Sequence, residues 1–123
     1  KALHETMKMA IAGNYVGHLS AKIQETIEKA GYRTVKQYSG HGIGKKLHES
    51  PTIPCVLNTA LEKTQVLSYN MTIAIEVIYT MGKPELKVMP DGWSVKTMDG
   101  SLAACFEKTV AVNKNGPIII TDW

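Results

Sequence analysis

The sequence predicts an α+β domain in which two helices pack on one face of an antiparallel sheet. Apolar residues recur with a helical spacing over about the first 30 positions. After Gly31 the pattern changes to the two-residue alternation that is typical of strands. The second half is rich in short apolar runs separated by turn dipeptides. Helices followed by such strands form a two-layer α+β structure.

Leu3, Met7 and Ile11 recur every four residues and predict a helix from residue 1 to about residue 12. Gly13-Asn14 is expected to end it, because both residues tolerate the left-handed conformation.

A second helix is expected to follow, with Ser20 as its N-cap and Gly31 as its stop. Ile23, Ile27 and Ala30 would form its buried face.

The strand pattern begins with alternation over residues 32–38, which is expected to run directly into a glycine loop at 40–44. Residues 45–67, with Pro51 and Pro54, predict an irregular connection. The remaining strands are expected at residues 71–80, 93–98, 102–112 and 118–121. Two turn dipeptides lie between them, Asp91-Gly92 and Asp99-Gly100, and the second fits a tight hairpin.

Size and composition predict one domain over residues 1–123, in the cytoplasm. The net charge of +3 comes from scattered Lys and Arg, with Lys45-Lys46 as the only adjacent pair, which does not favour nucleic acid binding.

Cys55 and Cys105 are expected to be reduced, semi-buried apolar residues. No apolar run reaches the roughly 20 residues of a membrane span. The chain starts at Lys1 within helical sequence, as expected of a fragment.

The stretch Gly40-His41-Gly42-Ile43-Gly44 is the strongest indication of a functional site. Three glycines in five residues do not suit the interior of a helix or strand, but they allow positive φ and close approach of the backbone. They are expected to place the His41 imidazole, a potential metal ligand, at the surface of a tight bend.

Glu76 and Glu107 are acidic residues within apolar strand sequence. Burying an ionised carboxylate costs several kcal/mol unless it is paired or binds a metal. Glu76 could instead be exposed on an edge strand, and Glu107 could form an ion pair involving Lys108. Together with His41, the two glutamates suit a divalent metal such as Mn, Fe(II), Co or Zn.

Two groups of motifs closely resemble the type I methionine aminopeptidases. The first is Gly40-His41-Gly42-Ile43-Gly44 with His48-Glu49-Ser50-Pro51 and Ile53-Pro54. The second is residues 91–97, 99–104 and 106–109, which contain the Asp-Gly-Trp block. Relatives such as the prolidases share the glycine-histidine loop but lack this block, and the match extends over nearly the whole chain.

The resemblance implies one half of a pita-bread fold, whose two pseudo-symmetric halves enclose a two-metal site. By motif, His41, Glu76 and Glu107 correspond to metal ligands, with Glu107 bridging both ions. Glu76 would also handle the proton, and His48 would contact the substrate near the scissile peptide, although a loop histidine bonded to backbone is the alternative. Leu47 and Trp93 would lie near the methionine pocket.

The sequence departs from the family pattern in several ways. Family members take two further metal-binding aspartates from the preceding half, whereas the aspartates here are Asp91 and Asp99 in turns and Asp122 near the end. This chain alone is therefore expected to bind at most one metal, weakly, and to have little activity. Asn70 and Val77 replace the usual glycine and proline. Lys108 replaces a histidine, and its cation could pair with Glu107 and compete with a metal.

The resemblance implies an enzyme that removes initiator methionine from nascent peptides, with the ribosome as a possible partner. The alternative is a non-catalytic module of the same fold that binds a protein or RNA. A half-fold is also expected to self-associate or to pair with a separate first half, because it leaves a strand edge and apolar surface open.

Overall fold

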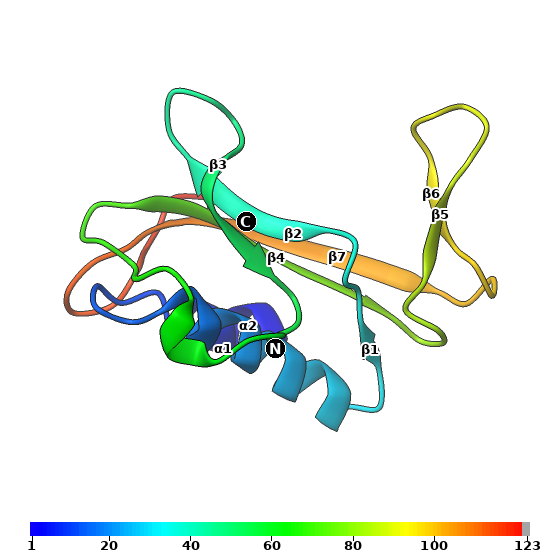
Figure 1. Ribbon diagram of the computed structural model, residues 1–123, viewed down its shortest axis with the longest axis horizontal. Helices are drawn as coiled ribbons and strands as arrows, with labels where there is room; N and C mark the ends of the chain where they lie inside the picture. The colour runs from blue at the N-terminus through cyan, green and yellow to red at the C-terminus, as the bar shows by residue number, and fades with distance from the viewer. Residues whose placement is uncertain (122–123) are drawn as a thin grey trace.

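The computed structural model describes residues 1–121, in which two helices lie on one face of a six-stranded antiparallel sheet (Figure 1). The predicted α+β class is therefore confirmed. The elements, in chain order, are α1 Ala2–Met7, α2 Val16–Lys29, β1 Arg33–Thr34, β2 Ser39–Ile43, β3 Glu49–Pro54, the 3₁₀ turn η1 Leu61–Lys63, β4 Thr72–Thr80, β5 Leu86–Val88, β6 Val95–Thr97, β7 Ala103–Ala111 and β8 Ile118–Ile119.

Helix α1 ends at Met7, five residues before the predicted end. The backbone beyond it bonds to distant segments: Ala12 N–H donates to the Asn113 carbonyl at 3.0 Å, and Gly13 N–H donates to the Leu67 carbonyl at 2.9 Å. These bonds replace the helical ones, and Ile11 is half-buried outside the core cluster, so its spacing from Met7 does not indicate a helix. Gly13 does adopt positive φ, at 95°.

Helix α2 begins at Val16, so the prediction of Ser20 as its N-cap is wrong. Ser20 lies inside the helix and is buried. The helix start is stabilised instead by the Tyr15 N–H, which donates to His18 Nδ1 at 2.9 Å. Ile23 and Ile27 are buried as predicted, but Ala30 is exposed.

Strand β4 is the centre of the sheet, whose order is β3-β2-β4-β7-β8, with β1 also pairing to β4. It pairs with β7 over nine residues, with Glu76 opposite Glu107. Ile73, Ile75 and Val77 alternate along β4 and pack into the core beneath the helices. Side chains alternate between faces, so Glu76 and its cross-strand partner point to the face without helices.

Three predicted features between residues 32 and 67 are wrong. The expected strand at 32–38 is reduced to the two residues of β1, and the expected glycine bend is itself strand β2. The supposed irregular connection contains β3, which pairs with β2 in a hairpin. Pro51 and Pro54 fit because β3 is an edge strand, where a missing N–H is tolerated.

The glycines of β2 are needed for close approach and not for backbone conformation. None of Gly40, Gly42 and Gly44 has positive φ. A Cβ at Gly40 would run into the Ala74 carbonyl oxygen of β4, and one at Gly42 would run into the Ser50 carbonyl oxygen. Glycine therefore lets β2 sit tightly between its neighbours on both sides.

Strands β5 and β6 form a separate hairpin, an arm that stands away from the main sheet (Figure 1). Asp91-Gly92 lies in its loop, whereas Asp99-Gly100 follows β6 and does not join paired strands, so the hairpin predicted there is wrong. The arm is held at its base by the Gln37 amide, which bonds to both backbone groups of Leu86 at 2.8 and 3.1 Å.

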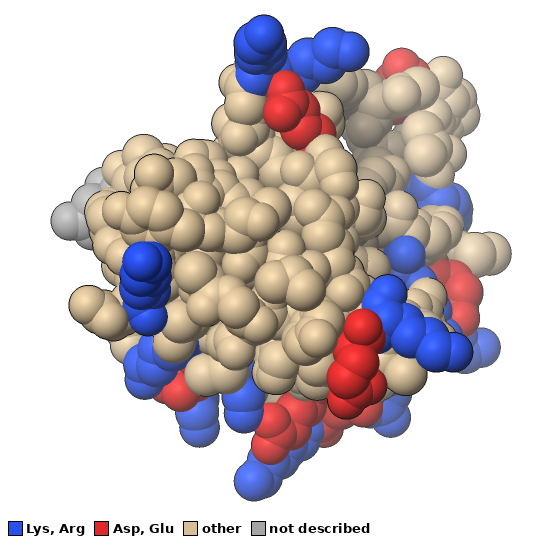
Figure 2. All heavy atoms as spheres, turned by 60° about the vertical axis from the view of Figure 1, so that its left-hand side comes forward, with Lys and Arg blue, Asp and Glu red and all other residues tan. Residues whose placement is uncertain are grey.

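Charged side chains do not gather into one basic patch on the face shown in Figure 2. Lys, Arg, Asp and Glu are spread around its rim, and the middle is uncharged. Among the described residues no helix has both the length and the apolar character needed to cross a membrane.

Replacing Gly40 with Ala tests the close approach of β2 to β4. The added methyl meets backbone atoms that cannot rotate away, so we expect destabilisation of about 1–3 kcal/mol. Urea denaturation measures it, with Ser39→Ala on the same strand as the control. An unfolding free energy of Gly40→Ala equal to that of the control would show that the strands have room to move apart.

Candidate metal centre

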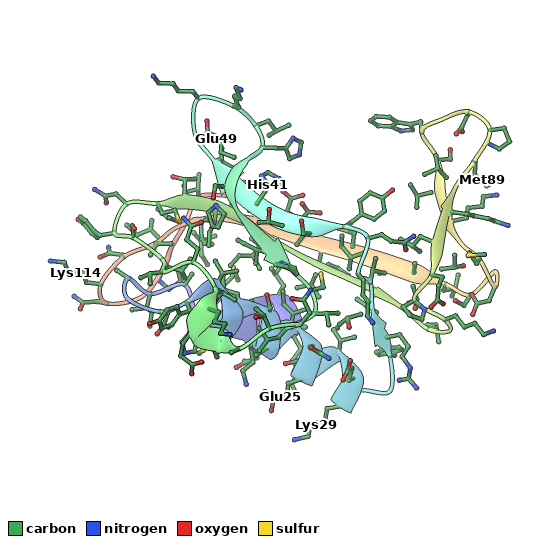
Figure 3. All side chains as sticks on the ribbon, in the orientation of Figure 1. Glu25, Lys29, His41, Glu49, Met89 and Lys114 are labelled. Carbon is green, nitrogen blue, oxygen red and sulfur yellow. The ribbon has the colours of Figure 1, made fainter. Side chains whose placement is uncertain are left out.

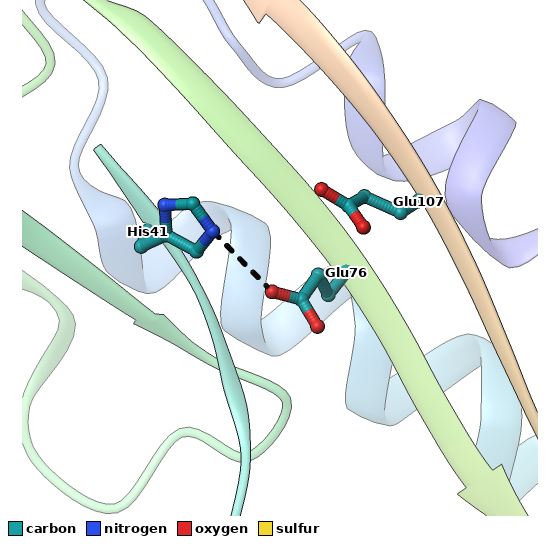
Figure 4. Close-up of side chains that lie close together, drawn as sticks. All are labelled: His41, Glu76 and Glu107. Atoms are coloured by element: carbon teal, nitrogen blue, oxygen red, sulfur yellow. Dashed lines mark ion pairs between the residues drawn. The ribbon is translucent and has the colours of Figure 1, made fainter. Parts of the chain in front are cut away.

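Three candidate ligands from three strands converge on the face of the sheet without helices. His41 lies on β2, Glu76 on β4 and Glu107 on β7. One ligand atom from each lies within 4.8 Å of the others. Figure 4 shows the three side chains pointing toward one another. This spacing allows one ion to contact all three residues.

Strand register explains why these residues meet. Glu76 and Glu107 are directly opposite each other, and His41 is opposite Ala74, two residues before Glu76 on the same face. A slip of one residue in any strand would turn its ligand toward the helices. The sequence separation of the three residues therefore contains little information about their proximity.

The orientation of His41 suits a metal ligand. Its Nδ1 lies 2.9 Å from the Gly42 carbonyl oxygen. Because a carbonyl only accepts, this bond requires the proton on Nδ1, so the neutral ring has its lone pair on Nε2. Nε2 points at Glu76, with 3.7 Å to Oε1 (Figure 4), and the imidazole is only 12% exposed.

Glu76 lies in an electrostatically unfavourable position for a carboxylate. Burial raises its pKa above the usual value, and the Glu107 carboxylate raises it further, while the His41 and His48 imidazoles lower it. The alternative that Glu76 is exposed on an edge strand is wrong, since β4 lies between β2 and β7 and its side chain is 19% exposed. A cation between the carboxylates would offset both costs.

Lys108 does not lie beside the Glu107 carboxylate, so the alternative of an ion pair between these two residues is wrong. It is opposite Ile75, on the helix side of the sheet, and is buried. Its Nζ donates to the Thr121 carbonyl oxygen at 2.7 Å. Adjacent residues of a strand point to opposite faces, so this lysine does not compete for a metal on the other side.

His48 lies next to the cluster, in the loop between β2 and β3. Its ring meets the His41 ring edge-on, with 4.3 Å between centroids. The structure thus brings together all four residues expected at the reaction centre: His41, His48, Glu76 and Glu107.

The two residues expected at the methionine pocket are not brought together. Leu47 is exposed in the β2–β3 loop, and Trp93 is 89% exposed in the loop of the β5–β6 arm. A cavity of about 870 Å³ does separate the arm from the sheet, and its lining includes Tyr38, Ile78 and Cys105. It opens on the same face as the cluster.

Asp91 and Asp99, the aspartates within the described residues, accept hydrogen bonds from backbone N–H groups in turns. Asp91 accepts bonds from the N–H groups of Trp93 and Ser94. Asp99 accepts from the N–H groups of Lys83 at 2.7 Å and Ser101 at 3.0 Å, and these bonds hold its pKa at about 2. Asp122 lies outside the described residues.

Cys105 is a neighbour of the cluster that the sequence reasoning treated only as an apolar residue. It is on β7, two residues before Glu107 and so on the same face. Burial raises the pKa of its thiol to about 11, with further contributions from the Glu76 and Glu107 carboxylates. The two-residue spacing from Glu107 was the available signal. Cys55 is fully buried and Cys105 is exposed, so the prediction that both are semi-buried is wrong; neither is in a disulfide.

Known proteins resemble this chain over nearly its whole length. Residues 1–114 match the family described as metallopeptidase family M24. The chain is 43% identical over 122 residues to the methionine aminopeptidase of Aquifex aeolicus, covering 99% of this chain and 47% of that protein. It is 38% identical over 121 residues to the methionine aminopeptidase of Escherichia coli K12, with coverage of 98% and 45%.

Solved structures agree with the sequence comparison. The crystal structure of methionine aminopeptidase from Thermotoga maritima superposes with a TM-score of 0.93 at 38% identity, covering 99% of this chain and 48% of that one. An X-Pro aminopeptidase from the same organism, at 24% identity and a TM-score of 0.70, shares the fold. The predicted half of a pita-bread fold is confirmed, and the chain spans about half the length of the curated relatives it matches.

The pH dependence of stability tests the contacts of Asp99. Its lowered pKa means that its contribution is complete above the unfolded value of 3.8 and is lost as the pH falls through about 2. We therefore expect wild type to exceed Asp99→Asn in unfolding free energy at pH 5, and the difference to shrink by pH 2. Urea titrations at both pH values measure it, with Glu62→Gln as control. A constant difference would contradict the bonding described.

Proposed function

The chain belongs to metallopeptidase family M24, and we propose that it forms the metal-binding half of a methionine aminopeptidase. The observation that carries the proposal is the convergence of His41, Glu76 and Glu107 within 4.8 Å. The names of the relatives support the substrate, the N-terminal methionine of a nascent peptide. A module that only binds protein or RNA has no need of these side chains together.

The residues fit a divalent metal by their chemistry. One neutral imidazole and two carboxylates suit Mn, Fe(II), Co or Zn. The bond of His41 Nδ1 to the Gly42 carbonyl orients the ring and makes Nε2 a better ligand. When bound, such an ion supplies Lewis acidity and lowers the pKa of a coordinated water.

Glu76 is the proposed proton carrier as well as a ligand. Its pKa is raised by burial and by Glu107, so it accepts a proton more readily than an exposed glutamate does. His48 is proposed to hold the substrate near the scissile peptide, because its ring lies beside His41 at the open side of the cluster.

Leu47 and Trp93 are proposed to line the methionine pocket together with residues outside this chain. Each is exposed here, which is costly for large apolar side chains unless another surface covers them. The cavity between the arm and the sheet leaves room for the rest of the peptide. The ribosome as partner and the cytoplasm as location are further parts of the proposal.

We infer that residues 1–123 are the second half of the catalytic domain and that a first half completes the site. Among residues 1–121, β8 pairs with Val110 and Ala111 on the outer side of β7, and the residues after β8 bond to the β7 backbone only as far as Thr109. Glu107 therefore lies on a strand with an open edge, where further ligands would arrive from a neighbouring strand. The two missing aspartates of the family pattern are proposed to come from there, so this chain alone holds at most one ion, weakly.

Calorimetric titration of the chain with Mn, Fe(II), Co and Zn tests the metal site. We expect weak binding of one ion, lost in His41→Ala and in Glu107→Ala because each removes one of three ligands. His48→Ala keeps all three and serves as the control. Equal heats of binding for wild type and both ligand variants would show that this cluster is not the metal site.

Release of methionine from a Met-initiated peptide tests the need for a first half. We expect the chain alone to show little activity and to gain it when a first half from a relative is co-expressed. Light scattering at high concentration should show self-association of the chain alone, through the open edge of β7. A monomeric chain with the activity of an intact enzyme would contradict both expectations.

A further inference from the structure

We propose that Glu49 is a positioning residue that sets the shape of the β2–β3 loop and thereby orients His48 against His41. The loop spans residues 44–48, and Glu49 is the first residue of β3. Glu49 is exposed and is not one of the three clustered ligands, so its carboxylate is free to act within the loop. Only the link to catalysis rests on the function proposed above; the geometry stands without it.

The Glu49 carboxylate folds back across the loop it closes. Its Oε1 accepts a hydrogen bond from the Lys46 N–H at 2.8 Å. The Lys46 carbonyl in turn accepts from the Gly44 N–H at 3.1 Å. Two bonds therefore tie the middle of the loop to both of its ends, and one of them comes from a side chain.

Gly44 provides the space for this arrangement. A Cβ at Gly44 would lie 2.8 Å from Glu49 Cδ and 3.0 Å from its Oε1, both closer than carbon and oxygen atoms pack. The carboxylate is the flexible end of its side chain, so it would move away, and the bond to Lys46 would be lost with it. The third glycine of the glycine-histidine stretch thus has a specific partner, unlike Gly40 and Gly42, which meet backbone.

His48 lies directly before Glu49, so its orientation follows from where the loop ends. Glu49 pairs with Gly42, immediately after the register shift that follows His41. This pairing brings the end of the loop back over β2 and sets the two imidazoles edge-on, with centroids 4.3 Å apart. Figure 3 shows Glu49 and His41 labelled in the same hairpin, with Glu49 nearer to the loop.

Nuclear magnetic resonance of the metal-free 123-residue chain tests the proposal. In Glu49→Ala we expect hydrogen exchange at the Lys46 amide to rise about fivefold or more and the ring-to-ring contacts between His41 and His48 to weaken. Glu49→Gln keeps an acceptor oxygen in place and should restore both signals. Glu62→Ala removes another exposed glutamate and should change neither.

The Gly44→Ala variant tests the same contact independently. We expect it to reproduce the effects of Glu49→Ala, because it displaces the carboxylate without removing it. In a Glu49→Ala background the added methyl has nothing to displace, so the double variant should resemble either single variant. Additive effects would contradict the assigned contact.

Three results would overturn the proposal. The first is a Glu49→Ala variant in which hydrogen exchange at the Lys46 amide rises but the contacts between the His41 and His48 rings stay unchanged. His48 would then be oriented by other groups. Another is failure of Glu49→Gln to restore the signals. The third is an unchanged Lys46 amide in Glu49→Ala. Metal titration separates this proposal from the proposed function, because Glu49→Ala should keep the affinity that His41→Ala loses.

Discussion

The antiparallel register across β2, β4 and β7 is the constraint on which the site depends. It places Glu76 opposite Glu107 and His41 two positions away on the same face. The opposite face of β4 carries Ile73, Ile75 and Val77 into the core. The core therefore specifies the position of Glu76, because a one-residue shift of β4 that misplaced this ligand would also turn the three apolar side chains away from the helices.

Burial shapes the chemistry of this cluster as much as proximity does. Two carboxylates on adjacent strands repel each other, and the sheet removes much of the water around Glu76, whereas Glu107 stays exposed. The raised pKa of Glu76 records this cost, which a bound cation would offset. Close packing of β2 through Gly40 and Gly42 keeps His41 near the two carboxylates. The orientation of its ring follows from the hydrogen bond to the Gly42 carbonyl.

Sequence reasoning predicted the elements whose own residues specify them. Strands β4 and β7, nine residues each, coincide with apolar runs in the sequence, and their ends were predicted within one residue. Prediction from the sequence failed where contacts between distant segments determine where an element ends. Helix α1 stops at Met7 because the following backbone bonds to Asn113 and Leu67, which local spacing does not reveal. The β2–β3 hairpin was not predicted, because its glycines and prolines indicated a loop. The glycines allow close approach of neighbouring strands, and the prolines lie on an edge strand. The cluster was predicted from unusual acids and family motifs, but its geometry, the place of Lys108 and the nearness of Cys105 required the register.

X-ray absorption of the zinc-loaded chain shows whether His41, Glu76 and Glu107 bind one ion together. We expect a shell of nitrogen and oxygen only, at about 2.0–2.2 Å, with the outer scattering of a single imidazole that disappears in His41→Ala. A shell containing sulfur at about 2.3 Å, or an imidazole signal that survives in His41→Ala, would contradict this expectation.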